Sequence, residues 1–344
     1  MKPTSRVLLG ISLAAGLAAV QPPHAAAADD TVVVASWGGS IQELLTKVLF
    51  QPFEQASGIH VIADDTSTIG KAEAMARSGN VAWDVFMASD QDVAQAEEDH
   101  LLMPLDWNVI PKADLMQGAA TPDAVAAYTY GTVMTYNTKA ISKPPRSWAE
   151  WWNTATYSCR RTMRNVPVDD LEMAVMSSGV APDKVYPIDL ALAYKQLDPI
   201  QPHVVSFWDS GAQSIQLVAE GSACLGTAWN NRVVAAMKDG QPISFVWDEA
   251  LIHHDYYTVM KDAPHAAAAM KLIAYAMRPD VQAKIANAIA LVPVNMQAFS
   301  AIDPAMAKYM PTAENLAHAV PVDMSWWAPN MKPAYRKFSS WLVR

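Results

Sequence analysis

Polar and aromatic side chains gather where several predicted strands end, and these are the residues whose types could do chemistry. They are Ser36 and Trp37, Ser89 and Asp90, Trp229 to Arg232, and Asp255 to Tyr257. Open parallel sheets bind ligands at the carboxyl ends of their strands, and aromatic walls are common in small-molecule sites. Each position also has a purely structural interpretation, because a lone tryptophan often belongs to the core and Asp90 can cap the helix that starts near Gln91.

Signatures of common enzymes are absent from the sequence, which has no GxSxG, HExxH, GxGxxG or GxxxxGK[ST] motif. The nearest approach to a metal site is His253-His254-Asp255. On a strand only His253 and Asp255 of these three share a face, whereas structural zinc takes four ligands. We therefore expect no metal, no cofactor and no enzymatic activity. An exported α/β enzyme stays as an alternative, because a triad assembled in space leaves no local motif.

The elements that must position these residues alternate between strands and helices. The predicted elements are strands at 31–36, 59–63 and 83–88 with helices at 41–57 and 71–78, followed by strands at 157–163 and 223–228 with helices at 169–178 and 211–219. Such alternation implies a parallel sheet with helices on its faces. The C-terminal part from Pro264 is predicted to be helical, with Arg278-Pro279 interrupting the run.

Two extended aromatic segments, 128–137 and 255–260, lack the Gly, Ser and Pro enrichment of a loose linker. We predict that they are strands that cross between two α/β lobes. Lobe 1 is then 29–132 plus 257–300, and lobe 2 is 133–256 plus 301–344. The length of the chain after its leader, at about 150 residues per domain, gives the same count of two.

The first 28 residues predict a signal peptide. Lys2 and Arg6 precede an apolar run from Val7 to Val20, and small residues for cleavage follow at Ala25 to Ala28. The apolar run is shorter than the roughly 20 residues that cross a bilayer. We expect an exported, soluble protein with a periplasmic location. Without Lys2 and Arg6 the formal charge changes from -9 to -11, which disfavours nucleic acid and anionic membranes as partners.

Cys159 and Cys224 are the two cysteines of the chain, and an oxidising compartment would let them pair. The sequence leaves open whether they form a disulfide or remain two buried thiols, because it does not give the separation of their Cα atoms.

Several motifs in register resemble one family along essentially the whole mature chain. They are WGGS at Trp37, GNVAWDV at Gly79, SWAEWW at Ser147, SGAQS at Ser210, LGTAWNNR at Leu225, and the helix, Arg-Pro-Asp turn, helix and Pro-x-Asn segment over 269–295. In these motifs the chain resembles the periplasmic solute-binding proteins of ABC importers, of the type that includes spermidine, putrescine and γ-aminobutyrate binders. The resemblance implies an α/β periplasmic-binding-protein fold of type II with two crossing hinge strands. It also implies closure on a small ligand and delivery of that ligand to an inner-membrane ABC permease.

The resemblance also suggests roles for individual residues: Trp37 and Trp229 as aromatic walls, and Asp255 as the carboxylate for a ligand ammonium. Polyamine binders carry a further acidic residue where this chain reads Asn165 to Val168, and Asp169 and Asp170 come slightly later. Arg232 occurs in amino-acid-binding relatives. A carboxylate on Arg232 and an ammonium on Asp255 describe a zwitterion, so we expect an ω-amino acid such as γ-aminobutyrate.

The predicted ligand-binding residues are Trp37, Ser89, Asp90, Ser210, Gln213, Trp229, Asn230, Arg232, Asp255 and Tyr256. Ser210 and Gln213 are included because the segment from Ser210 to Gln213 begins a predicted helix, where hydroxyl and backbone N–H groups could donate to the ligand carboxylate. Three alternatives remain open: a polyamine ligand, a sensor that presents its closed form to a receptor, and an Arg232 that pairs with Asp209 or Glu220 instead of ligand. We expect a monomer that closes on its solute.

Overall fold

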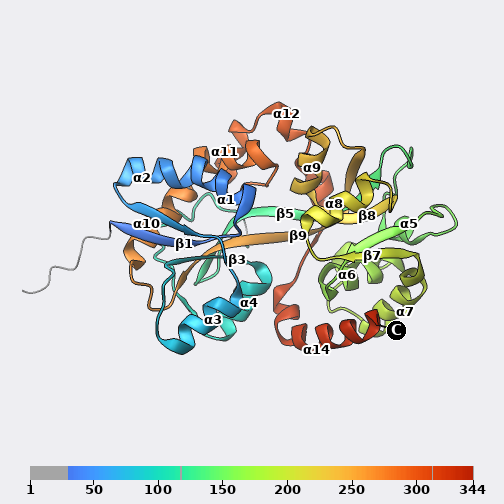
Figure 1. Cartoon of the computed structure of the whole chain (residues 1–344), viewed down its shortest axis with the longest axis horizontal. Helices are drawn as coiled ribbons and strands as arrows, with labels where there is room; N and C mark the ends of the chain where they lie inside the picture. The colour runs from blue at the N-terminus through green and yellow to red at the C-terminus, as the bar shows by residue number, and fades with distance from the viewer. Residues whose placement is uncertain (1–29, 117, 312, 344) are drawn as a thin grey trace, which may run out of the picture.

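The computed structural model describes residues 30–116, 118–311 and 313–343, so the predicted signal peptide lies outside the described residues. Within that part of the chain a single mixed sheet of ten strands runs through the molecule, with helices on both faces (Figure 1). The strand order is β2-β1-β3-β9-β5-β8-β6-β7, and the short strands β4 and β10 pair with β9. The α/β fold and its alternation of strands with helices agree with the prediction.

The N-terminal lobe holds the parallel pairs β1 with β2 and β1 with β3. Leu45, Leu49 and Phe53 belong to the apolar helical stripe that the sequence predicts. In the core of this lobe they pack with Val32 and Val34 of β1. Its elements are β1 Thr31–Ala35, α1 Gly39–Leu45, η1 Thr46–Phe50, α2 Gln51–Ser57, β2 His60–Asp64, α3 Ile69–Ser78, β3 Val85–Ser89, α4 Asp90–Glu98, β4 Leu102–Met103, α10 Ala266–Ala276 and α11 Pro279–Ile289.

The second lobe repeats this layout around β6, with β7 and β8 parallel to it on either side. Strand β6 begins at Arg161, four residues later than predicted. The elements of this part are α5 Trp148–Trp152, β6 Arg161–Arg164, α6 Pro167–Ser177, η2 Pro182–Lys184, α7 Leu190–Ile200, η3 Gln201–His203, β7 Val204–Trp208, α8 Gly211–Ala219, β8 Leu225–Trp229, α9 Asn230–Lys238, α12 Pro304–Ala307, α13 Ala313–Ala317, β10 Val320–Pro321 and α14 Met324–Leu342. The 3-10 helix η4 Met296–Ala301 instead bonds to the N-terminal lobe, through Asp114 and Asn287.

Two long antiparallel strands, β5 Ala124–Asn137 and β9 Ile243–Met260, connect the lobes (Figure 1). Strand β9 begins at Ile243, twelve residues before the predicted crossing segment. Each of these strands contributes to the cores of both lobes. Tyr128 and Tyr257 pack in the core of the first lobe, whereas Val133 and Ile252 pack in the core of the second. The predicted lobe boundaries fall inside these two intervals and stay a prediction.

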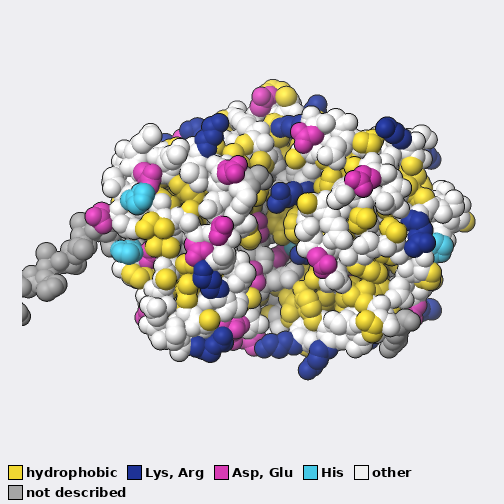
Figure 2. Space-filling model, viewed as in Figure 1, with side chains coloured by type: hydrophobic (Ala, Val, Ile, Leu, Met, Phe, Trp, Pro, Cys, Tyr) yellow, Lys and Arg dark blue, Asp and Glu magenta, His cyan; other side chains and the backbone are white. Residues whose placement is uncertain are grey.

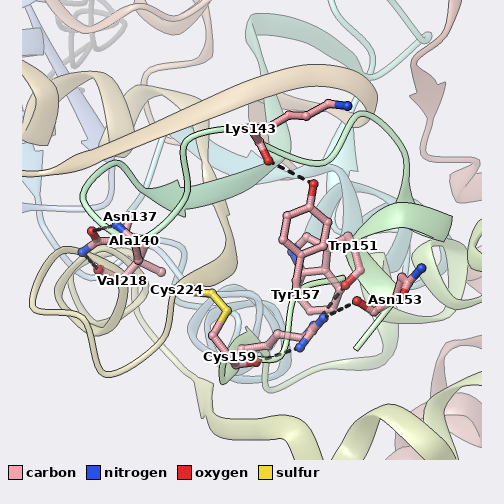
Figure 3. Close-up of a disulfide and its surroundings, with 10 residues drawn as sticks. Asn137, Ala140, Lys143, Trp151, Asn153, Tyr157, Cys159, Val218 and Cys224 are labelled. Carbon is pink, nitrogen blue, oxygen red and sulfur yellow. Dashed lines mark hydrogen bonds between the residues drawn. A yellow bond between two sulfur atoms is a disulfide. The ribbon is translucent and has the colours of Figure 1, made fainter. Parts of the chain in front are cut away.

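A disulfide joins Cys159 to Cys224 in the second lobe, with Cα atoms 5.9 Å apart (Figure 3). The backbone explains this approach, because the Cys224 amide donates a hydrogen bond to the Arg160 carbonyl where β8 and β6 begin to pair. Beside it the buried Arg161 guanidinium donates to the carbonyls of Trp151, Asn153 and Cys159. The disulfide therefore ties the strand pair that carries Arg164 and Trp229 at its far end.

Candidate functional site

A cavity of about 400 Å³ lies between the two lobes, where the surface is hollowed in the centre of Figure 2. This volume is in the range expected of small-molecule sites. The wall of the cavity combines aromatic faces, hydroxyls and charged groups of both signs. The lining residues are Trp37, Ile41, Ser67, Thr68, Ile69, Ser89, Asp92, Tyr128, Tyr130, Arg164, Trp229, Asn231, Arg232, Asp255 and Leu291.

Strand register brings several of these residues together from distant parts of the chain. Asp255 of β9 lies opposite Ser89 of β3 on one side and opposite Tyr128 of β5 on the other. Trp229 at the end of β8 lies opposite Thr132 of β5. Side chains alternate between the faces of a strand, so the cavity wall is built from the residues of one face near the middle of the sheet.

The acidic wall of the cavity consists of Asp255 and Asp92. Burial, with a further contribution from the charge of Asp90, raises the pKa of Asp255 well above its usual value. Burial also raises the pKa of Asp92, which accepts a hydrogen bond from the Ser89 hydroxyl at 2.9 Å. A cation placed in the cavity would favour the ionised form of both carboxyl groups. This wall therefore suits a ligand ammonium group.

The opposite wall offers hydrogen-bond donors without protein partners. Among the described residues, Arg232 Nε and Trp229 Nε1 are buried and make no hydrogen bond. None of the ion pairs there joins Arg232 to Asp209 or Glu220. Gly211 makes room for this wall, because a Cβ atom there would lie 3.1 Å from the Trp229 ring and 3.2 Å from Arg232 Cγ. Buried hydrogen-bond donors nearly always have an acceptor in proteins. A ligand in the cavity could supply the acceptor for these two.

A second guanidinium, that of Arg164, also lines the cavity, with 20% of its side chain exposed. Its centre lies 5.3 Å from the Trp229 ring and 5.7 Å from the Trp208 ring, within cation–π range. Arg164 Nη1 donates to Asp169 Oδ2 at 3.4 Å. Burial lowers the pKa of Arg164, but Asp169 together with Tyr130, Tyr335 and Asp90 outweighs this effect and raises the pKa.

Half of the ten predicted ligand-binding residues line the cavity: Trp37, Ser89, Trp229, Arg232 and Asp255.

The other five have contacts within the protein. Asp90 binds His253, and Asn230 joins the Gly131 amide to the Ala290 carbonyl. Ser210 caps α8 by accepting from the Gln213 amide, and the Gln213 side chain accepts from the Asp209 amide. Tyr256 lies next to Asp255 on β9 and therefore points to the opposite face.

Seven polar or aromatic lining residues are not among the ten predicted ones: Ser67, Thr68, Asp92, Tyr128, Tyr130, Arg164 and Asn231. Arg164 directly follows the strand predicted at 157–163, so the carboxyl-end rule would have found it. Asp92 could also have been predicted, because it lies three residues after Ser89 at the start of a helix and residues with this spacing share a helix face. For Tyr128 and Tyr130 the crossing strand was predicted but its facing residues were not.

In the described ranges no three His, Cys, Asp or Glu side chains are grouped so that they could hold a metal ion. His253 and Asp255 share a face of β9, as expected, but His253 is occupied by two carboxylates. No helix within the same ranges is long and apolar enough to span a membrane.

Comparison with known proteins identifies the family. Residues 49–312 match the model of bacterial extracellular solute-binding proteins. The chain belongs to this family. A solved GABA receptor in the family's fold is 33% identical, with a TM-score of 0.85 over 91% of this chain and 97% of that chain.

Two relatives illustrate the range of ligands in this family of extracellular solute-binding proteins. The gamma-aminobutyric acid-binding protein of Pseudomonas aeruginosa is 29% identical over 93% of each chain. The spermidine/putrescine-binding periplasmic protein of Escherichia coli is 26% identical over 89% of each chain. The family and the two-lobed fold thus agree with the resemblance seen in the sequence.

Proposed function

We propose that the protein is the periplasmic substrate-binding component of an ABC importer and that its ligand is an ω-amino acid such as γ-aminobutyrate. The observation that carries this proposal is the pair of buried, unpartnered donors on Trp229 and Arg232, in the same cavity as the Asp255 carboxyl. A zwitterion with separated ends would satisfy both walls at once.

The chemistry of each wall matches one end of such a ligand. Arginine keeps its proton and matches a carboxylate with its planar fork. An ammonium group at Asp255 would gain an ion pair and, from Trp37 and Tyr128, aromatic faces for cation–π contact. Trp37 and Tyr128 lie together, with ring centroids 6.3 Å apart. The similarity to γ-aminobutyrate-binding proteins supports the same ligand class.

A diamine or polyamine is the second candidate, and one observation favours it. Two carboxyl groups, Asp92 and Asp255, line the same cavity, and the E. coli relative binds spermidine and putrescine. Against it stand two guanidinium groups, Arg164 and Arg232, in that cavity. A polyamine would lie beside both positive charges without supplying an acceptor for the buried donors.

The proposal includes no catalytic step. It includes a monomer in the periplasm, an ABC permease as the partner, and closure of the lobes around the hinge strands β5 and β9. Small-angle scattering with and without saturating γ-aminobutyrate should give a smaller radius of gyration for the bound protein. An unchanged radius would contradict closure on this ligand.

A thermal-shift screen tests the ligand class. Its compounds should be γ-aminobutyrate, putrescine and spermidine, together with butyrate and butylamine as controls that keep only one charged end. A ligand of the folded state at about 100 times its Kd adds about 2.7 kcal/mol of stability. We expect γ-aminobutyrate to raise the melting temperature and both controls to have little effect. A shift with putrescine alone, or with none of these compounds, would overturn the proposed ligand.

A further inference from the structure

Four charged residues form a continuous chain behind the cavity, which we call the interlobe chain: Asp90, His253, Asp169 and Arg164. His253 Nδ1 lies 2.7 Å from Asp90 Oδ2, and His253 Nε2 lies 2.7 Å from Asp169 Oδ1. Asp169 Oδ2 then accepts from Arg164 Nη1 at 3.4 Å. Asp90, His253 and Asp169 are at most 5% exposed, so these contacts are shielded from water.

The members of the interlobe chain come from both lobes and from the hinge. Asp90 is the first residue of α4 in the N-terminal lobe, and His253 lies in the middle of hinge strand β9. Asp169 in α6 and Arg164 at the end of β6 belong to the second lobe. A rotation of the lobes about β9 would change the distance between Asp90 and Asp169, so the complete chain depends on the lobe arrangement seen in this structure.

The geometry gives His253 a positive charge. Each ring nitrogen faces a carboxylate oxygen, and an imidazole can donate to both only when both nitrogens carry protons. Burial lowers the pKa of His253, but Asp169 and Asp90 outweigh it and raise the value to about 10. Tyr130 also faces this region, with its ring stacked on His253 at 5.2 Å. The further titratable groups near the chain are Asp92, Asp170, His254, Asp255 and Tyr335.

The backbone holds Asp169 in an unusual conformation at this point. Its φ of 77° lies in the left-handed region, and Val168 beside it is also non-helical, which interrupts α6. Such conformations are unfavourable for a residue other than glycine and persist only where the surroundings require them. Here the Thr132 hydroxyl donates to Asp169 Oδ2 at 2.9 Å, so Asp169 is fixed between β5, His253 and Arg164.

We propose that Asp90, His253 and Asp169 position Arg164 at the cavity wall when the lobes close, and that Arg164 is a second arginine that contacts the acidic end of the ligand. Arg164 has five N–H donors, and Asp169 takes one of them, which leaves donors for a ligand. The charges of the chain alternate and sum to zero, so its members compensate one another, whereas Arg232 Nε has no hydrogen-bond partner among the described residues. The inference rests on the proposed function for its ligand.

Three variants test the proposal with γ-aminobutyrate as the probe and calorimetry over pH 6–9. Arg164→Gln removes the ligand contact and should weaken binding at least tenfold at every pH. Asp169→Asn should have a similar effect, because Arg164 loses its partner. Asp90→Asn keeps the lining residues and leaves His253 with one carboxylate, but it also removes a charge that raises the pKa of Asp255. Its affinity should fall about three- to tenfold, with a wild-type to variant ratio that increases with pH. The part of this loss that acts through Arg164 should disappear when Asp90→Asn is made in the Arg164→Gln background.

Asp183→Asn serves as the matched control, since Asp183 is an exposed residue in η2 of the second lobe. It should bind like the wild type. Far-UV circular dichroism should show that each variant is folded. If Asp90→Asn lowers only the melting temperature and its affinity ratio stays near one from pH 6 to 9, the chain stabilises the fold without positioning Arg164, and the proposal is wrong.

Nitrogen-15 spectra of the histidine side chains provide a test that requires no variant to fold and no ligand to bind. In the wild type His253 should show two protonated ring nitrogens at pH 8. A neutral ring at that pH would overturn the interlobe chain directly. If the wild type does not bind γ-aminobutyrate, the proposed function fails, while these spectra still decide the state of the chain. If it binds putrescine instead and Arg164→Gln tightens that binding, the role of Arg164 is wrong.

Discussion

Two groups of buried charged residues lie in the same cleft, and they differ in whether the protein itself supplies their partners. In the interlobe chain each charge meets an opposite charge of the protein, from Asp90 through His253 and Asp169 to Arg164. At the cavity wall, Arg232 Nε has no partner among the described residues, and burial, with the charge of Asp90, raises the pKa of Asp255 in spite of the opposing charge of His253. Charges that the protein satisfies fix an arrangement, whereas the unsatisfied groups that also line the cavity are available to a ligand.

The largest effect should follow from removing the unsatisfied carboxyl group. Asp255→Asn keeps the size of the side chain but cannot supply a negative charge to the ligand ammonium. A hydrogen bond between charged groups contributes about 1.5–3 kcal/mol, and we expect a loss near the upper end, about a hundredfold in affinity for γ-aminobutyrate. Calorimetry against the Asp183→Asn control measures it. Unchanged affinity would place the ammonium elsewhere in the cavity.

Arg232→Ala removes the opposite unsatisfied charge and should weaken γ-aminobutyrate binding at least tenfold. The effect is smaller than that of Asp255→Asn because Arg164 and Trp229 can still donate to the carboxylate. Arg336→Ala on the exposed face of α14 is the matched control. Equal affinities for both variants and the wild type would show that Arg232 does not contact the ligand.

Binding should also release a proton. The empty cavity favours the neutral form of Asp255, and an ammonium group favours the ionised form, so the complex holds fewer protons than the free protein. The affinity must then rise with pH through the pKa of Asp255 in the empty site. Calorimetry at one pH in two buffers with different ionisation enthalpies should give different apparent binding enthalpies. Identical enthalpies in both buffers would mean that Asp255 is already ionised.

The disulfide should have the smallest effect on binding, because neither cysteine lines the cavity. Its 65-residue separation predicts about 4 kcal/mol of stabilisation from the restricted unfolded chain. Replacing both cysteines by serine should therefore lower the free energy of unfolding by that order, with affinity for γ-aminobutyrate within about twofold. Alkylation under denaturing, non-reducing conditions should find no free thiol in periplasmic wild-type protein. Two alkylated cysteines there would exclude the bridge.

The sequence predicted those parts of the fold that have a regular pattern. The helix at 211–219 has the bounds of α8, and the apolar stripe from Ile41 to Phe53 packs in the core. The first half of β9 was missed because its pattern is irregular. Glu249 has a positive φ, and the register between β5 and β9 shifts near Thr132, so the alternation of apolar and polar residues breaks at Asp248-Glu249.

The cavity wall was harder to predict because consecutive residues at a helix start point in different directions. Ser89 and Asp92 line the cavity, whereas Asp90 between them faces His253. In the second lobe Trp229 and Arg232, three residues apart, line it together with Asn231, and Asn230 is buried. Residues three apart share a helix face and neighbours do not. The strand-end rule locates the correct loop, and the helical period within that loop selects the side chains.

The preference for a zwitterion over a diamine is the central claim, and paired calorimetry of the wild type and Arg232→Ala tests it most directly. The two titrants should be γ-aminobutyrate and putrescine, which share an ammonium end and differ at the other. The account predicts that the wild type prefers γ-aminobutyrate and that Arg232→Ala loses affinity for γ-aminobutyrate while its affinity for putrescine is unchanged or improved. A wild type that binds only putrescine would contradict the account, as would an Arg232→Ala variant that keeps its full affinity for γ-aminobutyrate.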